Sequence, residues 1–290
     1  MIKYISQKGV DGFGHQLLGI MSLISLTSDN IVYVPYLHDG NFEHVDDKEK
    51  IELKEYLVKF YDILGYKYPH DFSKYPPKRV MDRNLNNYNS EIIGNRYARS
   101  KIPTEELDWE KHTHVFDNAW SETDIGKKIY NYNFYNSLNN ELLLDNNFNS
   151  EYTNIVIHLR GGDVESVHRR PPADINKLNE VIGKLKNDYS NYYFHFHTNN
   201  NGVSDNILNY INDNRYKVYG KSTKVLFSLS QMLTADILIV ADSTLSIAAS
   251  YVNKGKIIVP QKLACCKDGD EDLHPIKGRN AISLEDFLVN

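Results

Sequence analysis

Hydrophobic positions in the second half of the chain fall into short β-branched runs separated by longer amphipathic stretches. The short runs predict strands, because a brief apolar run bounded by glycine or polar turns suits a strand buried on both faces. The intervening stretches predict helices, and regular alternation of strand and helix is typical of a parallel sheet. We therefore expect an α/β fold with strands at 154–158, 192–197, 216–219, 236–240 and 256–259 and helices near 174–187, 204–212, 223–233 and 244–252.

The first half of the chain carries a weaker pattern. Apolar runs at 2–6 and 31–35 predict two strands, and residues 17–26 predict a largely buried helix. Residues 48–64 have the spacing of an amphipathic helix. From 66 to about 150 the pattern is irregular, with scattered proline and asparagine, and it predicts no definite element.

A polar segment at 145–150 has the composition of a linker. It separates the irregular region from the regular alternation that follows. We therefore expect two domains, 1–150 and 151–290, each of an ordinary domain size.

Composition limits the partners and the compartment. With 290 residues, 41% of them hydrophobic and 24% charged, the chain is a globular protein able to bury a core. A formal net charge of −5 argues against nucleic acid or an anionic membrane as partner, and no apolar run is long enough to span a membrane. Cys265 and Cys266 are adjacent and are the only cysteines, which favours a reducing compartment without disulfides. Because residues 17–26 lack a signal-peptide cleavage pattern, we expect a cytoplasmic protein.

A histidine, an arginine and an aspartate follow the strand predicted at 154–158: the sequence reads His158-Leu-Arg160-Gly161-Gly162-Asp163. Ligands of open α/β sheets bind at the carboxyl ends of the strands. The planar fork of Arg160 suits a phosphate, and paired glycines let a phosphate approach the backbone. The alternative is a surface Arg–Asp pair that closes a turn.

Two other strand ends carry polar groups. Asp242, Ser243 and Thr244 lie between a predicted strand and a helix, where hydroxyls and free N–H groups can hold a diphosphate. Alternatively, Asp242 or Ser243 caps the helix. Thr198 and Asn199 follow the strand at 192–197 and are able to hydrogen-bond a ribose or a base.

The same strand carries His195 and His197 on one face. Such a pair can bind a metal, but no third ligand is apparent, so we interpret it as packing and expect no metal. The acidic run at 268–272 fits a solvated surface better than a cation site.

A glycine-containing loop follows the first predicted strand and precedes a helix. It contains Gly12, Gly14, His15 and Gln16, and its backbone N–H groups surround a possible anion or sugar site. The glycine spacing does not match the dinucleotide-binding fingerprint. Polar residues also crowd the segment after the second strand, either as catalytic groups or as a solvated loop.

Three of these blocks, in order, resemble the fucosyltransferase superfamily. Residues 12–16 resemble its Gly-x-Gly-Asn-Gln loop, residues 158–163 its His-x-Arg-x-x-Asp donor motif, and residues 241–246 its Asn-Ser-Thr-Phe-Ser block. The resemblance implies a GT-B-like fold, with two Rossmann-like domains facing across a cleft. It implies a metal-independent glycosyltransferase with an acceptor-side domain at 1–150 and a nucleotide-sugar-binding domain at 151–290.

The resemblance also implies roles for individual residues. Arg160 would pair with the donor diphosphate, with His158 and Asp163 shaping that site. Ser243 and Thr244 would hold phosphate from the helix N-terminus, and a glycan or glycoprotein hydroxyl would be the acceptor. Residues that would contact the nucleoside are Thr198 and Asn199. Candidates for the base are Asp11, His15, Asp39 and Glu43, with His168 a weaker one.

The chain also departs from that family. Many members carry a second arginine where this chain has Gly161, and His15 replaces the usual asparagine; Arg169 or Arg170 would supply the missing charge. GDP-fucose is the expected donor. Residues 11–16 and 42–44 also resemble uncharacterised viral and bacterial glycosyltransferase-like proteins, which leaves a UDP-pentose such as UDP-xylose open. A binding protein without catalysis and a sugar-nucleotide-modifying enzyme remain as further alternatives.

Overall fold

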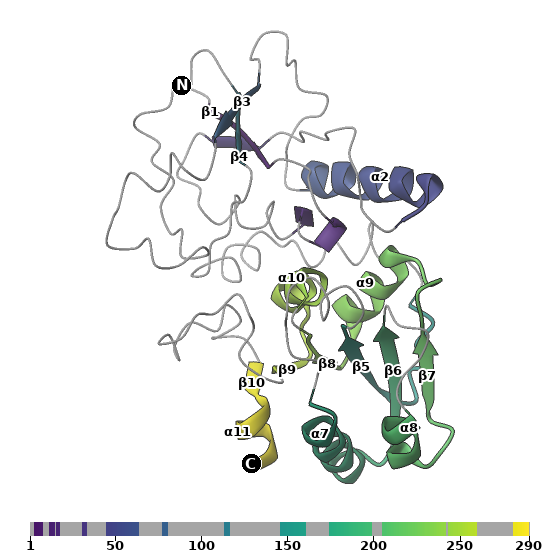
Figure 1. Ribbon diagram of the computed structural model, residues 1–290. Coiled ribbons are helices and arrows are strands. Elements are labelled where there is room, and N and C mark those ends of the chain that lie inside the picture. The colour runs from purple at the N-terminus through teal and green to yellow at the C-terminus, as the bar shows by residue number, and fades with distance from the viewer. Residues whose placement is uncertain are drawn as a thin grey trace. The chain divides into compact units, whose positions relative to one another are not determined.

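The computed structural model divides into two compact units, Met1–Leu143 and Leu144–Asn290 (Figure 1). This division falls upstream of the boundary expected at 150. Both units contain an all-parallel sheet with helices, which confirms the predicted α/β class. The structure describes residues 3–7, 12–14, 16–17, 31–33, 45–63, 77–80, 113–116, 146–160, 174–198, 205–241, 243–259 and 281–289.

In the described residues of the first unit there are a four-stranded sheet and one long helix. The strands are β1 Lys3–Gln7, β2 Ile31–Tyr33, β3 Pro77–Val80 and β4 Thr113–Phe116, and the helix is α2 Asp47–Ile63. The order is β2-β1-β4-β3, with all neighbours parallel. Strand β3 begins at a proline, which is tolerated because β3 lies at the sheet edge. The helix expected at 17–26 lies beyond the described residues except for Leu17.

Helix α2 forms as its amphipathic pattern predicts. The Asp46 side chain accepts the Glu49 amide at 2.8 Å, which satisfies one of the unpaired N–H groups at the helix start. Leu53, Tyr56 and Leu57 are buried along one face. Their spacing of three and four residues is that of one helix face.

The second unit carries the regular strand–helix alternation. Its helices are α7 Ile175–Asp188, α8 Asp205–Ile211, α9 Val225–Thr234, α10 Thr244–Val252 and α11 Leu284–Val289. Its strands are β5 Thr153–Leu159, β6 Tyr192–Thr198, β7 Tyr216–Tyr219, β8 Ile237–Ile239, β9 Lys256–Val259 and β10 Ala281–Ser283. The strand order is β10-β9-β8-β5-β6-β7, and every pair is parallel. This is the order of doubly wound nucleotide-binding sheets.

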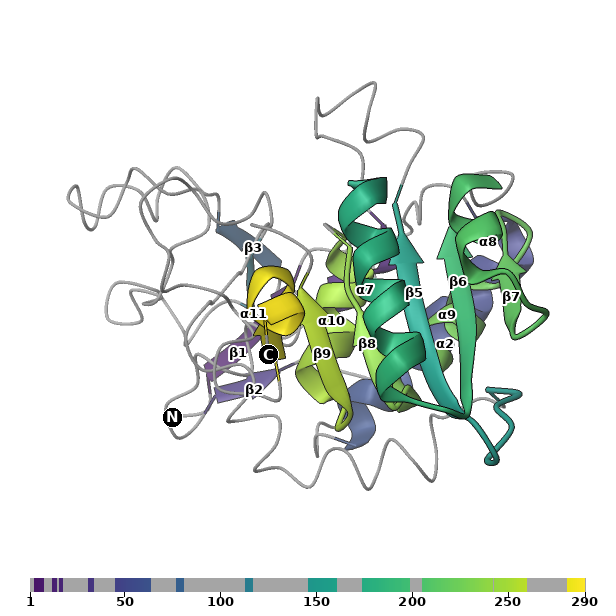
Figure 2. The same ribbon diagram turned by 90° about the horizontal axis from the view of Figure 1, so that it is seen from below.

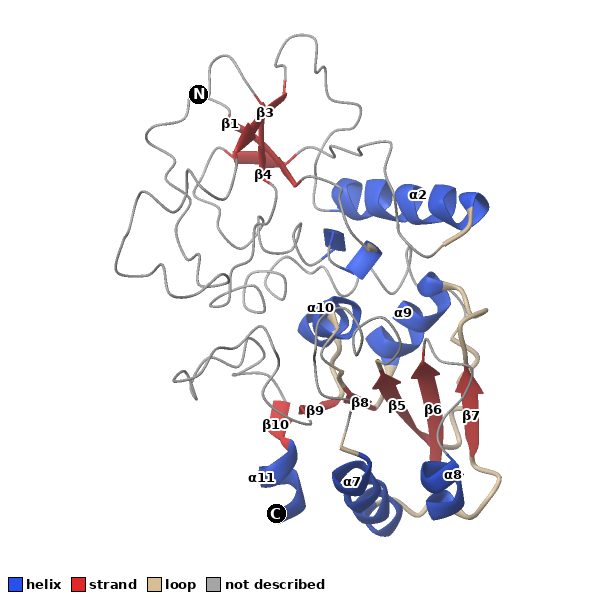
Figure 3. Cartoon of the chain, in the orientation of Figure 1, coloured by secondary structure: helices blue, strands red, loops and turns tan. Residues whose placement is uncertain are grey.

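Helices cover both faces of this sheet (Figures 2 and 3). Helices α7, α8 and α11 pack on one face and bury a continuous apolar cluster. Helices α9 and α10 cover the other face. Alternation along a strand assigns its side chains to the two faces, so Ile155 and Ile157 belong to the apolar cluster whereas Val156 and His158 face α9 and α10.

The turn from α10 into β9 requires a glycine. A Cβ on Gly255 would lie 2.3 Å from the Asp236 carbonyl oxygen and 2.4 Å from that of Ala235. Asn253 secures the same turn, because its Nδ2 donates to the carbonyls of Met232 and Ala235 at 2.8 and 3.0 Å. The ends of α9 and α10 are thereby fixed to the start of β8.

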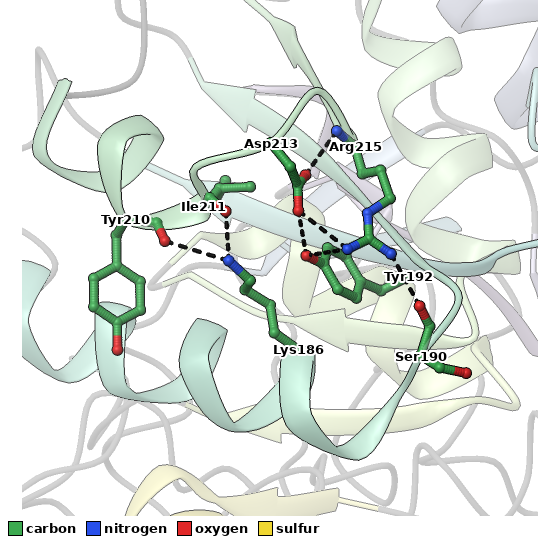
Figure 4. Close-up of polar contacts among 7 residues, drawn as sticks. All are labelled: Lys186, Ser190, Tyr192, Tyr210, Ile211, Asp213 and Arg215. Carbon is green, nitrogen blue, oxygen red and sulfur yellow. Dashed lines mark hydrogen bonds and ion pairs between the residues drawn. The ribbon is translucent and has the colours of Figure 1, made fainter.

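A polar cluster fixes the amino edge of the sheet (Figure 4). Arg215 Nη2 donates to the Tyr192 hydroxyl at 2.7 Å and to Asp213 Oδ2 at 3.2 Å, and its guanidinium carbon lies 3.8 Å from the centre of the Tyr192 ring. The Tyr192 hydroxyl in turn donates to Asp213. Lys186 donates to the carbonyl of Ile211 at the end of α8. The cluster holds the α8–β7 connection against the start of β6.

Candidate functional site

The strand order creates a switch point beside β5. From β5 the chain continues through β6 to β7 on one side, then crosses to β8 and continues through β9 to β10 on the other. Connections leave the carboxyl ends of β5 and β8 in opposite directions, and in open α/β sheets this is where ligands bind. The structure therefore favours the ends of β5 and β8 as the binding site of the second unit.

Arg160 and Ser243 meet at this point. Arg160 follows β5 directly, and its Nη1 donates to Ser243 Oγ at 3.3 Å. Ser243 is the N-cap residue of α10 and is only 6% exposed, yet its side chain makes no capping hydrogen bond. The sequence left open whether Ser243 merely caps the helix. In the structure its hydroxyl contacts the arginine and does not cap the helix.

The geometry suits an anion. A guanidinium offers several N–H donors in one plane, and the first amides of a helix carry a partial positive charge. Thr244, the first residue of α10, is half-buried. A diphosphate at this edge would therefore receive donors from two directions, the end of β5 and the start of α10.

His158 lies one position before the end of β5, opposite His197 of β6. Its side chain is partly exposed, but the Nδ1 atom is inaccessible to solvent and has no hydrogen-bond partner among the described residues. Burial, with smaller contributions from the charges of His197 and Arg160, lowers the pKa of His158 to about 3. At neutral pH His158 is therefore uncharged, and among the described residues at this edge the positive charge is that of Arg160.

His197 is a hydrogen-bonded core residue. Its Nε2 lies 2.7 Å from Gln231 Oε1 and its Nδ1 lies 3.0 Å from Ser228 Oγ, both on α9, while its ring stacks on Tyr219. Since Gln231 Oε1 only accepts, Nε2 carries the proton and Nδ1 is the acceptor. Burial lowers the pKa of His197 to about 4, opposed by the hydrogen bond to Gln231. Its neighbour His195 has the same character.

His195 bonds to Asn154 Oδ1 through Nε2 at 3.1 Å, and burial lowers its pKa to about 3. The interpretation of the His-x-His pair as packing agrees with these contacts. Among the described residues no group of three or more His, Cys, Asp or Glu side chains is placed to hold a metal ion.

The polar segment expected as a linker belongs to the second unit from Asn146 onward. Asn146 Nδ2 donates to Thr234 Oγ1 at 2.9 Å, and its carbonyl accepts from Gln231 Nε2 at 2.6 Å. The Phe148 ring packs on His195 with 4.7 Å between ring centres. Polar composition suggested a free linker, whereas Asn146 bonds to two side chains of α9.

The predicted site residues of the first unit are described in part. Gly12, Gly14 and Gln16 lie at the start of a short helical segment, in which the Gln16 amide donates to the Gly12 carbonyl at 3.2 Å. Gln16 is buried, and a Cβ at Gly12 would meet nothing within 4 Å. The glycine at 12 is therefore not required by crowding from the described residues.

Thr198 ends β6 beside Leu159 and is buried. The other predicted site residues lie outside the described residues: Asp11, His15, Asp39, Glu43, Gly161, Gly162, Asp163, Arg169, Asn199 and Asp242, as do His168, Arg170 and the acidic run 268–272.

Sequence reasoning did not single out Gln231 or Ser246. Both are completely buried polar residues on otherwise apolar helices. A buried polar side chain needs a hydrogen-bond partner, so a glutamine or serine on the buried face of an apolar helix is the signal that would have found them.

None of the helices in the part of the chain that the structure describes combines the length and apolarity needed to span a membrane.

By sequence, the chain matches no protein-family model and no curated protein. By structure, it is similar to the fucosyltransferase NodZ from Bradyrhizobium, at 12% identity over 89% of this chain and 94% of that one, with a TM-score of 0.43. It is similar to POFUT1 in complex with GDP-fucose (12% identity, 87% and 95% covered, TM-score 0.46). It is also similar to E. coli ADP-heptose LPS heptosyltransferase II (11% identity, 97% and 89% covered, TM-score 0.42).

Proposed function

We propose that this chain is a glycosyltransferase that moves a sugar from a nucleoside-diphosphate sugar to a hydroxyl of a glycan or glycoprotein. The observation that carries the proposal is the contact between Arg160 and Ser243 at the switch point of the sheet. It brings a guanidinium to the N-terminus of a buried helix, where a diphosphate is stabilised by charge and by oriented amides.

The reaction requires stabilisation of a leaving group. As the bond between the sugar C1 and the phosphate oxygen breaks, its electron pair stays on the nucleoside diphosphate, and the acceptor oxygen forms the new bond to C1. Arg160 neutralises the negative charge that develops on the diphosphate, which is the kind of stabilisation that contributes most to catalysis. His158, neutral at pH 7, lines this edge without adding charge.

The acceptor hydroxyl loses its proton in the same reaction. We place the base that accepts it in the first unit if the transfer inverts the anomeric centre. The candidates are the carboxylates and the imidazole singled out from the sequence, Asp11, Asp39, Glu43 and His15.

GDP-fucose is the donor we propose, because the blocks at 12–16, 158–163 and 241–246 resemble those of the fucosyltransferase superfamily. UDP-xylose is the second candidate, because Gly161 stands where many members of that family carry an arginine. Both donors would use Arg160 and Ser243 in the same way.

A thermal-shift screen separates the donors. A ligand that binds only the native state raises its melting temperature. We expect stabilisation by GDP and GDP-fucose, equal with and without Mn²⁺. Stabilisation by UDP and UDP-xylose alone would retain the proposed site and replace the donor, whereas no response to either pair would contradict the proposed function.

Arg160→Ala tests the catalytic role. We expect it to lower the transfer rate by about a thousandfold while the melting temperature stays near that of the unmodified chain. Arg215→Ala is the matched control, because Arg215 bonds to Ser190, Tyr192 and Asp213 at the opposite edge. It should lower the melting temperature and leave transfer by the folded protein unchanged. Wild-type transfer by Arg160→Ala would remove Arg160 from the mechanism. If the unmodified chain binds the donor but transfers no sugar, the chain is a binding protein.

A further inference from the structure

Ser246 lies in the first turn of α10 and is completely buried. Its hydroxyl accepts the Ala241 amide at 3.2 Å and lies 3.2 Å from the carbonyl oxygens of both Ala241 and Ser243. One hydroxyl therefore contacts both sides of the connection between β8 and α10. A serine hydroxyl has one proton and two lone pairs, so it can hold the amide and one of the two carbonyls at the same time.

The backbone at this connection closes tightly around Ser246. The Ser243 amide donates to the Ala241 carbonyl at 2.7 Å, and the Ile247 amide donates to the Ser243 carbonyl at 3.0 Å. The main chain of Ser243 is thus held from both sides, and its hydroxyl remains directed at Arg160. The position of Ser243 depends on the hydroxyl of Ser246 because that hydroxyl joins the two ends of the connection.

We propose that Ser246 is a positioning residue of the donor site, which holds Ser243 in place for the diphosphate and, through Ser243, orients the Arg160 guanidinium. The inference rests on the proposed function, because it assigns Ser246 to the same diphosphate site. We assign Ser246 no direct contact with donor or acceptor, because its hydroxyl bonds to backbone atoms of Ala241 and Ser243 within the described residues.

Ser250 provides a matched control on the same helix. It is also completely buried, and its hydroxyl donates to the Ile247 carbonyl at 2.6 Å. Like Ser246→Ala, Ser250→Ala therefore removes a buried hydroxyl from α10, but the one backbone hydrogen bond that it removes lies outside the β8–α10 connection. A difference between the two variants reports on that connection and not on the loss of a buried serine in general.

The test is calorimetric titration of the full chain with GDP and UDP, and with guanosine and uridine. We expect Ser246→Ala to weaken binding of the preferred diphosphate about tenfold, because a small displacement of a positioned group is enough to lose such a factor. Nucleoside binding should stay unchanged, and Ser250→Ala should bind the diphosphate like the unmodified chain. Unchanged diphosphate affinity in Ser246→Ala, or equal losses in both variants, would overturn the proposal.

A double-mutant comparison tests whether Ser246 acts on the diphosphate through Ser243. If Ser246 acts through Ser243, Ser246→Ala should have little further effect on diphosphate affinity in a Ser243→Ala background. Additive losses of diphosphate affinity from the two substitutions would show that Ser246 does not act through Ser243. If Ser246→Ala does not fold, Ser246→Thr, which keeps the hydroxyl, is compared with Ser246→Cys: tighter diphosphate binding by the threonine variant supports the role, and equal binding contradicts it.

Diphosphate binding by the unmodified chain and by the two variants Arg160→Ala and Ser246→Ala separates the two proposals. Binding of GDP or UDP that Arg160→Ala removes and Ser246→Ala preserves would retain the proposed function and reject the role of Ser246. Absence of any diphosphate binding by the unmodified chain would reject the proposed function, and the role of Ser246 with it.

Discussion

The two faces of the six-stranded sheet are built from different chemistry. Under α7, α8 and α11 the buried side chains are aliphatic or aromatic, among them Ile157, Phe194 and Phe196. Under α9 and α10 the same strands present His195 and His197, bonded to side chains of α9 and of β5. Apolar packing has no directional requirement, whereas a hydrogen bond fixes the distance and direction between two polar groups.

In this unit one face of the sheet contributes stability, and the other face fixes the positions of particular atoms. The apolar face stabilises the sheet through burial alone. The polar face fixes particular atoms: Gln231 bonds at once to His197, to the Tyr219 hydroxyl and to the Asn146 carbonyl. Arg160 and Ser243, the candidate site residues, lie at the end of β5 and the start of α10 on this second face.

Truncation on the apolar face should have the largest effect on stability. Phe194 is completely buried and packs between Tyr192 and Phe196. We expect Phe194→Ala to lower the free energy of unfolding by about 4 kcal/mol, measured by urea denaturation. Tyr193→Ala, the neighbouring position on the polar face and partly exposed, should cost less than half as much. Equal losses at the two positions would remove the energetic distinction between the faces.

Loss of one polar partner should have an intermediate effect. Gln231→Leu keeps a similar volume but leaves the groups on His197, Tyr219 and Asn146 without their partner. We expect a loss of about 2 kcal/mol in unfolding free energy. Met232→Leu, at the next buried position of α9, conserves volume and should cost under about 1 kcal/mol. If the two variants are equally stable, the network contributes no more than packing.

The pH dependence of stability reports on the buried histidines of the polar face. The pKa of His195 falls from 6.5 to about 3 on folding, so between these values the unfolded chain binds a proton that the folded chain does not. Stability is then lost as the pH falls below 6.5, by roughly 1.4 kcal/mol per pH unit for a single such histidine.

His195→Gln removes this titrating group and keeps a polar side chain. We expect its unfolding free energy to fall less steeply with decreasing pH than that of the unmodified chain, as measured by denaturation at a series of pH values from 7 to about 4. Parallel slopes for the two proteins would mean that His195 titrates alike in the folded and unfolded chains.

The sequence predicts the elements of the second unit closely, because its buried strands are continuous apolar runs and α7 has a clear polar start. Asp174 accepts the amides of Asn176 and Lys177, which begins α7 within a residue of the expected position. The strands β3, β4 and β10 were not predicted. They have three or four residues each, and polar residues interrupt them, so no continuous apolar run marks them as strands.

The candidate site could be predicted in part. The glycines after Arg160 and the hydroxyls at 243–244 mark strand ends and a helix start, which is local information. That Arg160 meets Ser243 depends on β5 and β8 being neighbours, and strand order is not written in a local pattern. The bonds of Gln231 to His197 and Asn146 likewise join groups that only the tertiary fold brings together, whereas those of Ser246 are local.

The cluster of Tyr192, Asp213 and Arg215 has a consequence for engineering. It lies at the amino edge of the sheet, while Arg160 and Ser243 lie at the carboxyl edge. Libraries that randomise the segments following β5 and β8 would therefore vary the candidate site without touching the contacts that hold the α8–β7 connection. The candidate site can accept substitutions while the opposite edge keeps its stabilising contacts.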